Sequence, residues 1–310
     1  MRILVSSFFL LISLYFLNRL RKYPTERGLR LPTLFSFPPF FLKIPLIRAA
    51  NSFLRFSTRK ERSIMIERSD GSALAVALYK RDGMKPLLIY IHGGGFFFSA
   101  PKAAYKEAER YSNELDFNVA MPDYVTSDEK PYPYPFLDIR EALLFFVKNR
   151  REYNLSDEIY IAGDSAGGAL AIELTKFAIE NKIKIRKLLL IYPVIDDSMT
   201  TPSMQKYNDS PLWNSRLNRR MWEVYLREGR GKYAVPSEIQ DLSGFPPTFI
   251  EVEEYDALRD EGLLFAEKLR KAGVPVTLKY NEKCYHGFDY FKSSPSVEKA
   301  KKERIAYLSD

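Results

Sequence analysis

The chain has 310 residues, of which 46% are apolar, and a formal net charge of +8 from 47 basic and 39 acidic residues. One sizeable core is expected, and so modest a charge gives little support to nucleic-acid binding, although it suits attraction to anionic lipid. The single cysteine excludes an internal disulfide, and one cysteine with two histidines argues against a zinc or haem site, so no cofactor or metal is expected.

The amino terminus holds an uncharged apolar stretch, residues 3–17, followed by NRLRK. A helix of this length spans roughly 22 Å, less than the ~30 Å hydrocarbon core, although snorkelling of flanking arginines could extend it. Because no small-residue cleavage site follows, residues 1–25 are predicted as an uncleaved hydrophobic anchor or signal-like segment, with a buried cap helix as the alternative. The positive charges after the stretch place the remainder on the cytoplasmic side of a membrane, and an unanchored cytoplasmic protein is the alternative.

Residues 26–310 are expected to form one domain, because strand-like runs alternate with helical patterns along it. The runs lie at residues 75–79, 86–91, 118–124, 158–163, 187–194, 248–254 and 275–281. This alternation predicts an α/β fold with a mostly parallel central sheet and helices on both faces. Two segments, at about 30–60 and 197–244, interrupt the rhythm and are predicted to form a helical cap over the catalytic end of the sheet.

A serine stands between a strand-like run and a helical pattern in YIAGDSAGGALAIEL, residues 160–174. In a tight strand-to-helix turn centred on Ser165, the positions two before and two after must lack bulk, which fits Gly163 and Gly167. This G-x-S-x-G pattern would direct the Ser165 hydroxyl outward at a helix N-terminus, where negative charge is favoured. An ordinary Ser/Gly turn is the alternative, so the choice depends on partner residues.

A nucleophilic serine needs a base and a carboxylate that orients the base. His286, in KCYHGFDY, follows one strand-like run, and Asp256 directly follows another. The chain order Ser165, Asp256, His286 is the order found in α/β-hydrolases. The neighbouring carboxylates Glu253, Glu254 and Glu261 are expected to be solvated surface charges.

The other histidine, His92, opens HGGGFFF directly after the run at residues 86–91. Three consecutive glycines allow bare N–H groups to approach a substrate oxygen, which indicates an oxyanion site, with a flexible hairpin as the alternative. His92 itself could be the base, but its position beside these glycines favours a hydrogen-bonded loop anchor. Cys284 lacks a glycine elbow, so a packing role is expected.

The motifs HGGGF, GDSAGG, YDALRDEG and HGF, in this order, resemble the hormone-sensitive-lipase-like family of α/β-hydrolases, a group of carboxylesterases and lipases. The resemblance runs from about residue 87 to residue 288. It implies an α/β-hydrolase fold with a helical cap, in which Ser165 is the nucleophile, His286 the general base and Asp256 its orienting acid.

The resemblance also implies an oxyanion hole made by the N–H groups of Gly94, Gly95 and Ala166. The sequence departs from the family pattern at Val125, where arginine is usual, and at Ser99, where glycine is expected. The implied activity is hydrolysis of small-molecule carboxylic esters, with short or medium acyl chains, through an acyl-enzyme. A catalytically inactive ligand-binding protein on the same fold is one alternative. A lipase or deacetylase acting on membrane-associated esters is another.

Overall fold

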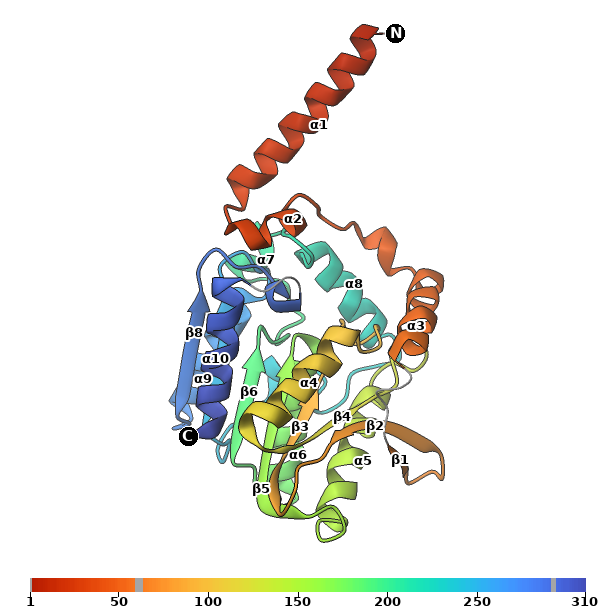
Figure 1. Cartoon of the computed structure of the whole chain (residues 1–310), viewed down its shortest axis with the longest axis vertical. Coiled ribbons are helices and arrows are strands. Elements are labelled where there is room, and N and C mark those ends of the chain that lie inside the picture. The colour runs from red at the N-terminus through yellow and green to blue at the C-terminus, as the bar shows by residue number, and fades with distance from the viewer. Residues whose placement is uncertain (1, 59–63, 291–293) are drawn as a thin grey trace.

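The computed structural model describes residues 2–58, 64–290 and 294–310, with side chains described from residue 12 onward (Figure 1). Eight strands form one sheet: β1 (Ile64–Glu67), β2 (Ala73–Tyr79), β3 (Lys85–Ile91), β4 (Asn118–Pro122), β5 (Leu155–Asp164), β6 (Lys187–Ile191), β7 (Thr248–Glu253) and β8 (Val276–Asn281). The α-helices are α1 (Arg2–Lys22), α2 (Arg30–Thr33), α3 (Ile44–Thr58), α4 (Lys102–Leu115), α5 (Tyr134–Lys148), α6 (Ala166–Glu180), α7 (Pro202–Lys206), α8 (Ser215–Tyr225), α9 (Arg259–Lys271) and α10 (Pro295–Ser309). Short 3₁₀ turns are η1 (Arg27–Leu29), η2 (Pro39–Leu42), η4 (Pro236–Glu238) and η5 (Phe288–Tyr290).

The strand order across the sheet is β1-β2-β4-β3-β5-β6-β7-β8. The pairs β1/β2 and β2/β4 are antiparallel, and every other neighbouring pair is parallel. The prediction of a mostly parallel sheet is therefore confirmed. Strand β1 was not predicted, because this edge strand has four residues and only Ile66 in it is fully buried.

Side-chain alternation along the strands divides the core between the two faces of the sheet. In β3, Leu87, Ile89 and Ile91 pack in the cluster that contains α5, α6 and α9. Leu88 and Tyr90 of the same strand point to the other face, into the cluster that contains α4 and α10. Because both faces of the central strands β3, β4 and β6 are covered, these strands are apolar at most positions, as the sequence runs indicated.

The parallel strands β5 and β6 end beneath the helices α7 and α8, at the end of the molecule from which α1 projects (Figure 1). The two segments predicted as cap elements meet there, since the Asn214 side-chain amide before α8 donates to the Phe37 carbonyl oxygen at 3.0 Å. Residues 59 and 60, at the end of the first segment, lie outside the described residues. The loops that follow β5 and β6 therefore lie on the side of the molecule where α7 and α8 are found.

The last turn of α1 is fastened to the body of the protein. Arg19 is 3% exposed and forms an ion pair with Asp209 at 3.0 Å, while the Tyr23 hydroxyl donates to the same carboxylate at 2.6 Å. The predicted anchor at residues 3–17 falls in part on side chains outside the described residues. In the part of the chain that is described, the helices are too short or too polar to cross a bilayer.

Candidate active site

Ser165 occupies the turn between β5 and α6, with φ +55° and ψ −122°. This backbone conformation is rare for a residue with a side chain and must be held by its surroundings. The Ser165 N–H donates to the Ile191 carbonyl at 2.9 Å, and the Ser165 carbonyl accepts from the N–H groups of Gly168 and Val194 at 2.9 and 3.0 Å. These three bonds hold the hydroxyl at the N-terminus of α6, where the helix dipole favours negative charge.

The two glycines that flank Ser165 have a steric reason. A Cβ on Gly163 would lie 2.2 Å from the Gly167 carbonyl oxygen, and a Cβ on Gly167 would lie 2.1 Å from the Ile91 carbonyl oxygen. Neither distance is compatible with a side chain, because both obstacles are backbone atoms. The requirement for no bulk, predicted from the G-x-S-x-G pattern, is confirmed.

The structure brings Ser165, His286 and Asp256 into one hydrogen-bonded chain. Ser165 Oγ lies 2.9 Å from His286 Nε2, and His286 Nδ1 lies 2.7 Å from Asp256 Oδ2. Asp256 is fully buried just after β7, where its other oxygen accepts from the Leu258 N–H at 2.9 Å. Asp256 Oδ2 faces His286 Nδ1, so the imidazole tautomer that fits this network carries its proton on Nδ1 and presents the Nε2 lone pair to the serine.

The glycine loop that follows β3 lies against the serine. A Cβ on Gly93 would be 3.1 Å from the Ser165 Cβ, and the next two glycines have φ values of +123° and +61°. Within the described residues, the N–H groups of Gly94, Gly95 and Ala166 make no hydrogen bond to the protein. These amides are thus available to a substrate oxygen beside Ser165.

His92 lies in the same loop, but its ring contacts Gly93 and Tyr124 rather than Ser165 Oγ. It is fully buried, its Nδ1 lies 2.7 Å from the Gly93 carbonyl oxygen, and its ring stacks on Tyr124 with centroids 4.4 Å apart. The Tyr124 hydroxyl donates to the His92 carbonyl at 2.9 Å. The histidine that contacts Ser165 Oγ is His286, and the surroundings of His92 are those expected of a loop anchor.

Asp164 is a site residue that sequence reasoning missed. Its buried carboxylate accepts from the hydroxyls of Tyr90 and Tyr290 at 2.8 and 2.6 Å and from the Gly93 N–H at 3.0 Å. Burial raises the pKa of this carboxyl from 3.8 to about 6. Asp164 therefore ties the glycine loop to the serine turn, and its position next to Ser165 in the motif was the signal that could have identified it.

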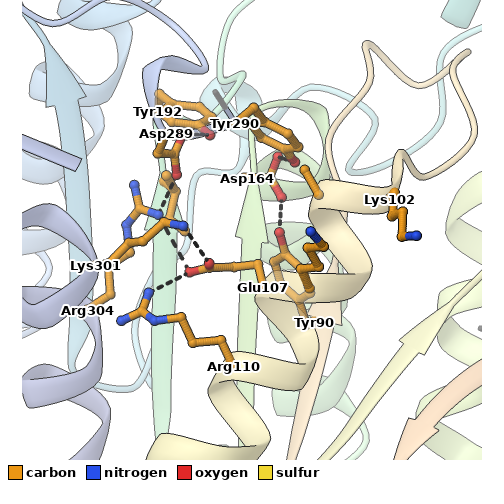
Figure 2. A pocket seen from close by; sticks show the side chains of 13 residues that line it. Tyr90, Lys102, Glu107, Arg110, Asp164, Tyr192, Asp289, Tyr290, Lys301 and Arg304 are labelled. Carbon is orange, nitrogen blue, oxygen red and sulfur yellow. Dashed lines mark hydrogen bonds and ion pairs between the residues drawn. The ribbon is translucent and has the colours of Figure 1, made fainter. Parts of the chain in front are cut away.

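A cavity of about 370 Å³ lies behind Asp164, between α4 and α10 (Figure 2). Arg304 of α10, which is fully buried, donates to Glu251 at 2.9 Å and to Asp289 at 2.6 Å. Asp289 also accepts from the Tyr192 hydroxyl at 2.7 Å, and the Tyr192 ring packs 4.6 Å from the His286 ring. This ionic network holds Tyr192 against the His286 ring. It joins segments that are far apart in the sequence, so no local sequence pattern predicts it.

The expectation that Glu253 and Glu261 are solvated is wrong. Both are buried, and burial raises the pKa of each well above its usual range. Glu261 in the first turn of α9 accepts from the N–H groups of Ile195 and Asp196, at 3.2 and 3.1 Å, because α9 packs under the loop after β6. Glu254 is partly exposed.

The structure also bears on Cys284 and on metal binding. Cys284 is 1% exposed and its pKa is raised by burial, in agreement with a packing role. Among the residues that the structure describes, no three His, Cys, Asp or Glu side chains are grouped as metal ligands.

Comparison with known proteins places this geometry in a family. Residues 88–290 match the family described as alpha/beta hydrolase fold. The chain is 29% identical over 199 residues to the putative alpha/beta hydrolase R526 of Acanthamoeba polyphaga mimivirus, a match that covers 62% of this chain and 57% of that protein. It is 30% identical over 223 residues to the carboxylesterase NlhH of Mycobacterium tuberculosis, covering 68% of each.

A solved structure titled bacterial heroin esterase has a TM-score of 0.83 at 27% identity, covering 93% of this chain and 98% of that one. The matched region contains Ser165, Asp256 and His286 together with the glycine loop. The chain belongs to the α/β-hydrolase fold family, in the hormone-sensitive-lipase-like group that its four motifs resemble.

Proposed function

We propose that this protein hydrolyses carboxylic esters, with Ser165 as the nucleophile. The observation that carries the proposal is the continuous hydrogen-bonded chain from Ser165 Oγ through His286 to the buried Asp256. The names of the relatives support it, since a carboxylesterase and an esterase are among them. An inactive relative that only bound ligand would need none of these three groups in register.

In the first half of the reaction, Ser165 Oγ attacks the ester carbonyl carbon and its proton passes to His286 Nε2. Asp256 keeps the imidazole oriented and stabilises the imidazolium that forms. The bond between the carbonyl carbon and the alcohol oxygen then breaks, and the alcohol leaves with the proton from Nε2. The product of this half is an ester between the acyl group and Ser165.

In the second half, water attacks the acyl carbon while His286 takes one of its protons. Ser165 Oγ leaves with that proton, so the enzyme is restored and a carboxylic acid is released. In both halves the carbonyl oxygen becomes negatively charged, and the amides of Gly94, Gly95 and Ala166 are the donors proposed to stabilise it.

The segments at residues 30–60 and 197–244 are proposed to act as the cap of residues 26–310. Ser165 is 6% exposed, and these segments are proposed to limit the access of substrate to it. Trp213 of the second segment packs against Gly95, where a Cβ would be 2.9 Å from the indole ring, and lies 6.0 Å from the His286 ring. This crowding favours short or medium acyl chains.

Hydrolysis of nitrophenyl esters with short and long acyl chains tests the proposal. The wild type should turn over short esters and react with a fluorophosphonate, and Ser165→Ala should do neither. Ser52→Ala, an exposed serine of α3, is the matched control and should behave as wild type. Folded wild-type protein that shows neither serine-dependent hydrolysis nor labelling would contradict the proposal and favour the inactive ligand-binding alternative.

We also propose that the N-terminal segment associates with a membrane, with the catalytic domain on the cytoplasmic side. Support comes from the apolar residues 3–17 and the basic residues after them. Removal of residues 2–17 keeps Arg19 and its Asp209 contact, and should lower the share of the protein in the membrane fraction while ester hydrolysis persists. A share equal to that of the full chain would contradict a membrane contact by these residues.

A further inference from the structure

The positive charge of the chain is concentrated at its N-terminal end. Of the 47 basic and 39 acidic residues, nine basic and one acidic lie in residues 2–58, which leaves 38 of each sign in the remainder. The whole formal excess of +8 thus belongs to α1, α2, α3 and their connections. The single acid there, Glu26, accepts from the Ser296 N–H at 3.2 Å, so it faces the C-terminal helix.

The same segment exposes most of the large apolar side chains. Eleven of the 17 exposed large apolar residues in the described part of the chain lie between residues 14 and 56. All six exposed phenylalanines are among them, with exposed fractions from 39% to 70%: Phe35, Phe37, Phe40, Phe41, Phe53 and Phe56. We call the exposed apolar side chains of residues 31–56 the aromatic face. So concentrated a set on one surface is unusual for a protein that contacts only water.

Helix α3 shows that the exposure follows a helical pattern. Its buried side carries Ile47, Asn51 and Thr58. Leu46, Phe53 and Phe56, spaced by seven and three residues, share the side that faces away from the body, within about 80° of the helix circumference. A helix on the surface of a globular protein normally carries polar residues there. In α3 the buried side carries Ile47 with two polar residues, Asn51 and Thr58, whereas the large apolar side chains lie on the exposed side.

Basic side chains are interleaved with these rings. Lys43 Nζ lies 4.8 Å from the centre of the Phe40 ring, and Arg30 and Arg48 are exposed on the neighbouring elements. Aromatic side chains beside Lys and Arg suit the boundary between anionic headgroups and acyl chains. We infer that the aromatic face docks on an anionic lipid surface, as a contact separate from the N-terminal apolar stretch.

The aromatic face is continuous with α1. The Phe16 ring of α1 lies 6.1 Å from the Phe35 ring, and Arg19 donates to the Phe35 carbonyl at 3.1 Å. The chain between α2 and α3 runs along the end of the body from which α1 projects (Figure 1). One bilayer can therefore be contacted by both α1 and the aromatic face. The fixed last turn of α1 sets the direction from which that bilayer approaches.

The buried side of α3 connects this face to the candidate active site. The Asn51 side chain donates to the Phe97 carbonyl at 2.8 Å and accepts from the Ser99 N–H at 2.9 Å, so α3 is bonded to the loop that contains the glycine triplet. A docked protein would hold this loop next to the lipid surface. Esters that partition into membranes are then the favoured substrates. This substrate class rests on the proposed hydrolysis, whereas the docking of the aromatic face is independent of it.

Vesicle binding by the full chain tests the inference. The probes are vesicles of phosphatidylcholine alone and of phosphatidylcholine mixed with phosphatidylglycerol. The first face variant combines Phe40→Glu with Phe41→Glu, and the second combines Phe53→Glu with Phe56→Glu. The matched control combines Met84→Glu with Leu264→Glu, which are 71% and 57% exposed outside this segment.

Wild type should bind the anionic vesicles more tightly than the neutral ones, and each face variant should bind them about tenfold or more weakly than wild type, while the control stays within about twofold. Equal binding by wild type and both face variants, with loss only in Leu14→Glu/Leu17→Glu, would overturn the inference and assign the contact to α1. Self-association that the face variants abolish, without vesicle binding by wild type, would also overturn it and indicate a second copy as the occupant.

Hydrolysis separates this result from the proposed function. Both face variants should hydrolyse a soluble short-chain nitrophenyl ester at the wild-type rate and lose hydrolysis of a medium-chain ester held in anionic vesicles. If no variant hydrolyses any ester, the proposed function fails, but sedimentation with vesicles still decides docking. If the face variants hydrolyse the vesicle-held ester as fast as wild type, delivery of substrate from the bilayer is refuted.

Discussion

Asp164→Asn tests whether the buried carboxylate behind the serine reduces stability at neutral pH. Burial raises the pKa of Asp164 from 3.8 to about 6 in the folded protein. Because the folded-state pKa lies above the unfolded one, the contribution of Asp164 to stability is fully present below about pH 4 and is lost as the pH rises through about 6. A difference of about 2 pKa units corresponds to ~3 kcal/mol in the free energy of unfolding.

Asparagine can keep the hydrogen bonds in a rearranged form, with its oxygen accepting from Gly93 and Tyr290 and its amide donating to the Tyr90 oxygen. The asparagine side chain cannot ionise. The difference in the free energy of unfolding between the variant and wild type should therefore change between acid and neutral pH. Urea unfolding of both proteins from about pH 4 to about pH 7 should show that difference changing by ~3 kcal/mol in favour of the variant.

The control is Asp241→Asn. Hydrogen bonds from the Ser243 hydroxyl and N–H lower the pKa of the exposed Asp241 to about 2, so this group stays ionised over the whole range. The stability curves of Asp241→Asn and wild type should therefore be parallel. Parallel curves for Asp164→Asn as well would refute the reasoning, because they would mean that Asp164 has the same pKa in the folded and unfolded chains.

Four other substitutions have definite outcomes. Gly167→Ala would place a Cβ 2.1 Å from the Ile91 carbonyl oxygen, so thermal unfolding should show a loss of ~3 kcal/mol or more, and a wild-type melting temperature would contradict the tight packing. His286→Ala should reduce kcat for nitrophenyl esters about ten-thousandfold and His92→Ala much less; equal losses would argue against His286 as the base. Glu173→Gln should raise stability at neutral pH, because burial raises the Glu173 pKa from 4.5 to about 8, so at neutral pH the unfolded wild-type chain has released a proton that the folded chain keeps, a loss of stability that glutamine does not have; urea unfolding that shows no gain would contradict this.

The sheet could be predicted because its strands are buried on both faces, which makes each one a continuous apolar run. β1 escaped prediction for the opposite reason, since an edge strand with one buried residue leaves little trace in sequence. For the site, the requirement for a base restricted the choice to two histidines, and spacing after the strands favoured His286. The structure places His286, and not His92, against Ser165.

Sequence reasoning selected Asp256, which directly follows a strand-like run, but it did not identify the other buried acids. Nothing in EVEEYDALRDE marks Glu253 or Glu261 as buried. Asp256 and Glu261 are both buried, but the first faces His286 and the second faces the amides of Ile195 and Asp196. Which acid does which depends on how α9 packs against the loop after β6, a tertiary contact between residues more than 60 positions apart.

Helix α3 joins two different requirements in one element. Its inner side must hold the glycine loop in place, and Asn51 does so with bonds to both Phe97 and Ser99. The Ser99 N–H donates one of these bonds, at the position where the family resemblance led us to expect glycine. The outer side makes no such bonds, so its apolar character cannot be explained by the packing of the hydrolase body. Large apolar side chains that face water add nothing to the stability of the folded chain. Their exposure on the outer side of α3 is the arrangement that docking on a lipid surface requires.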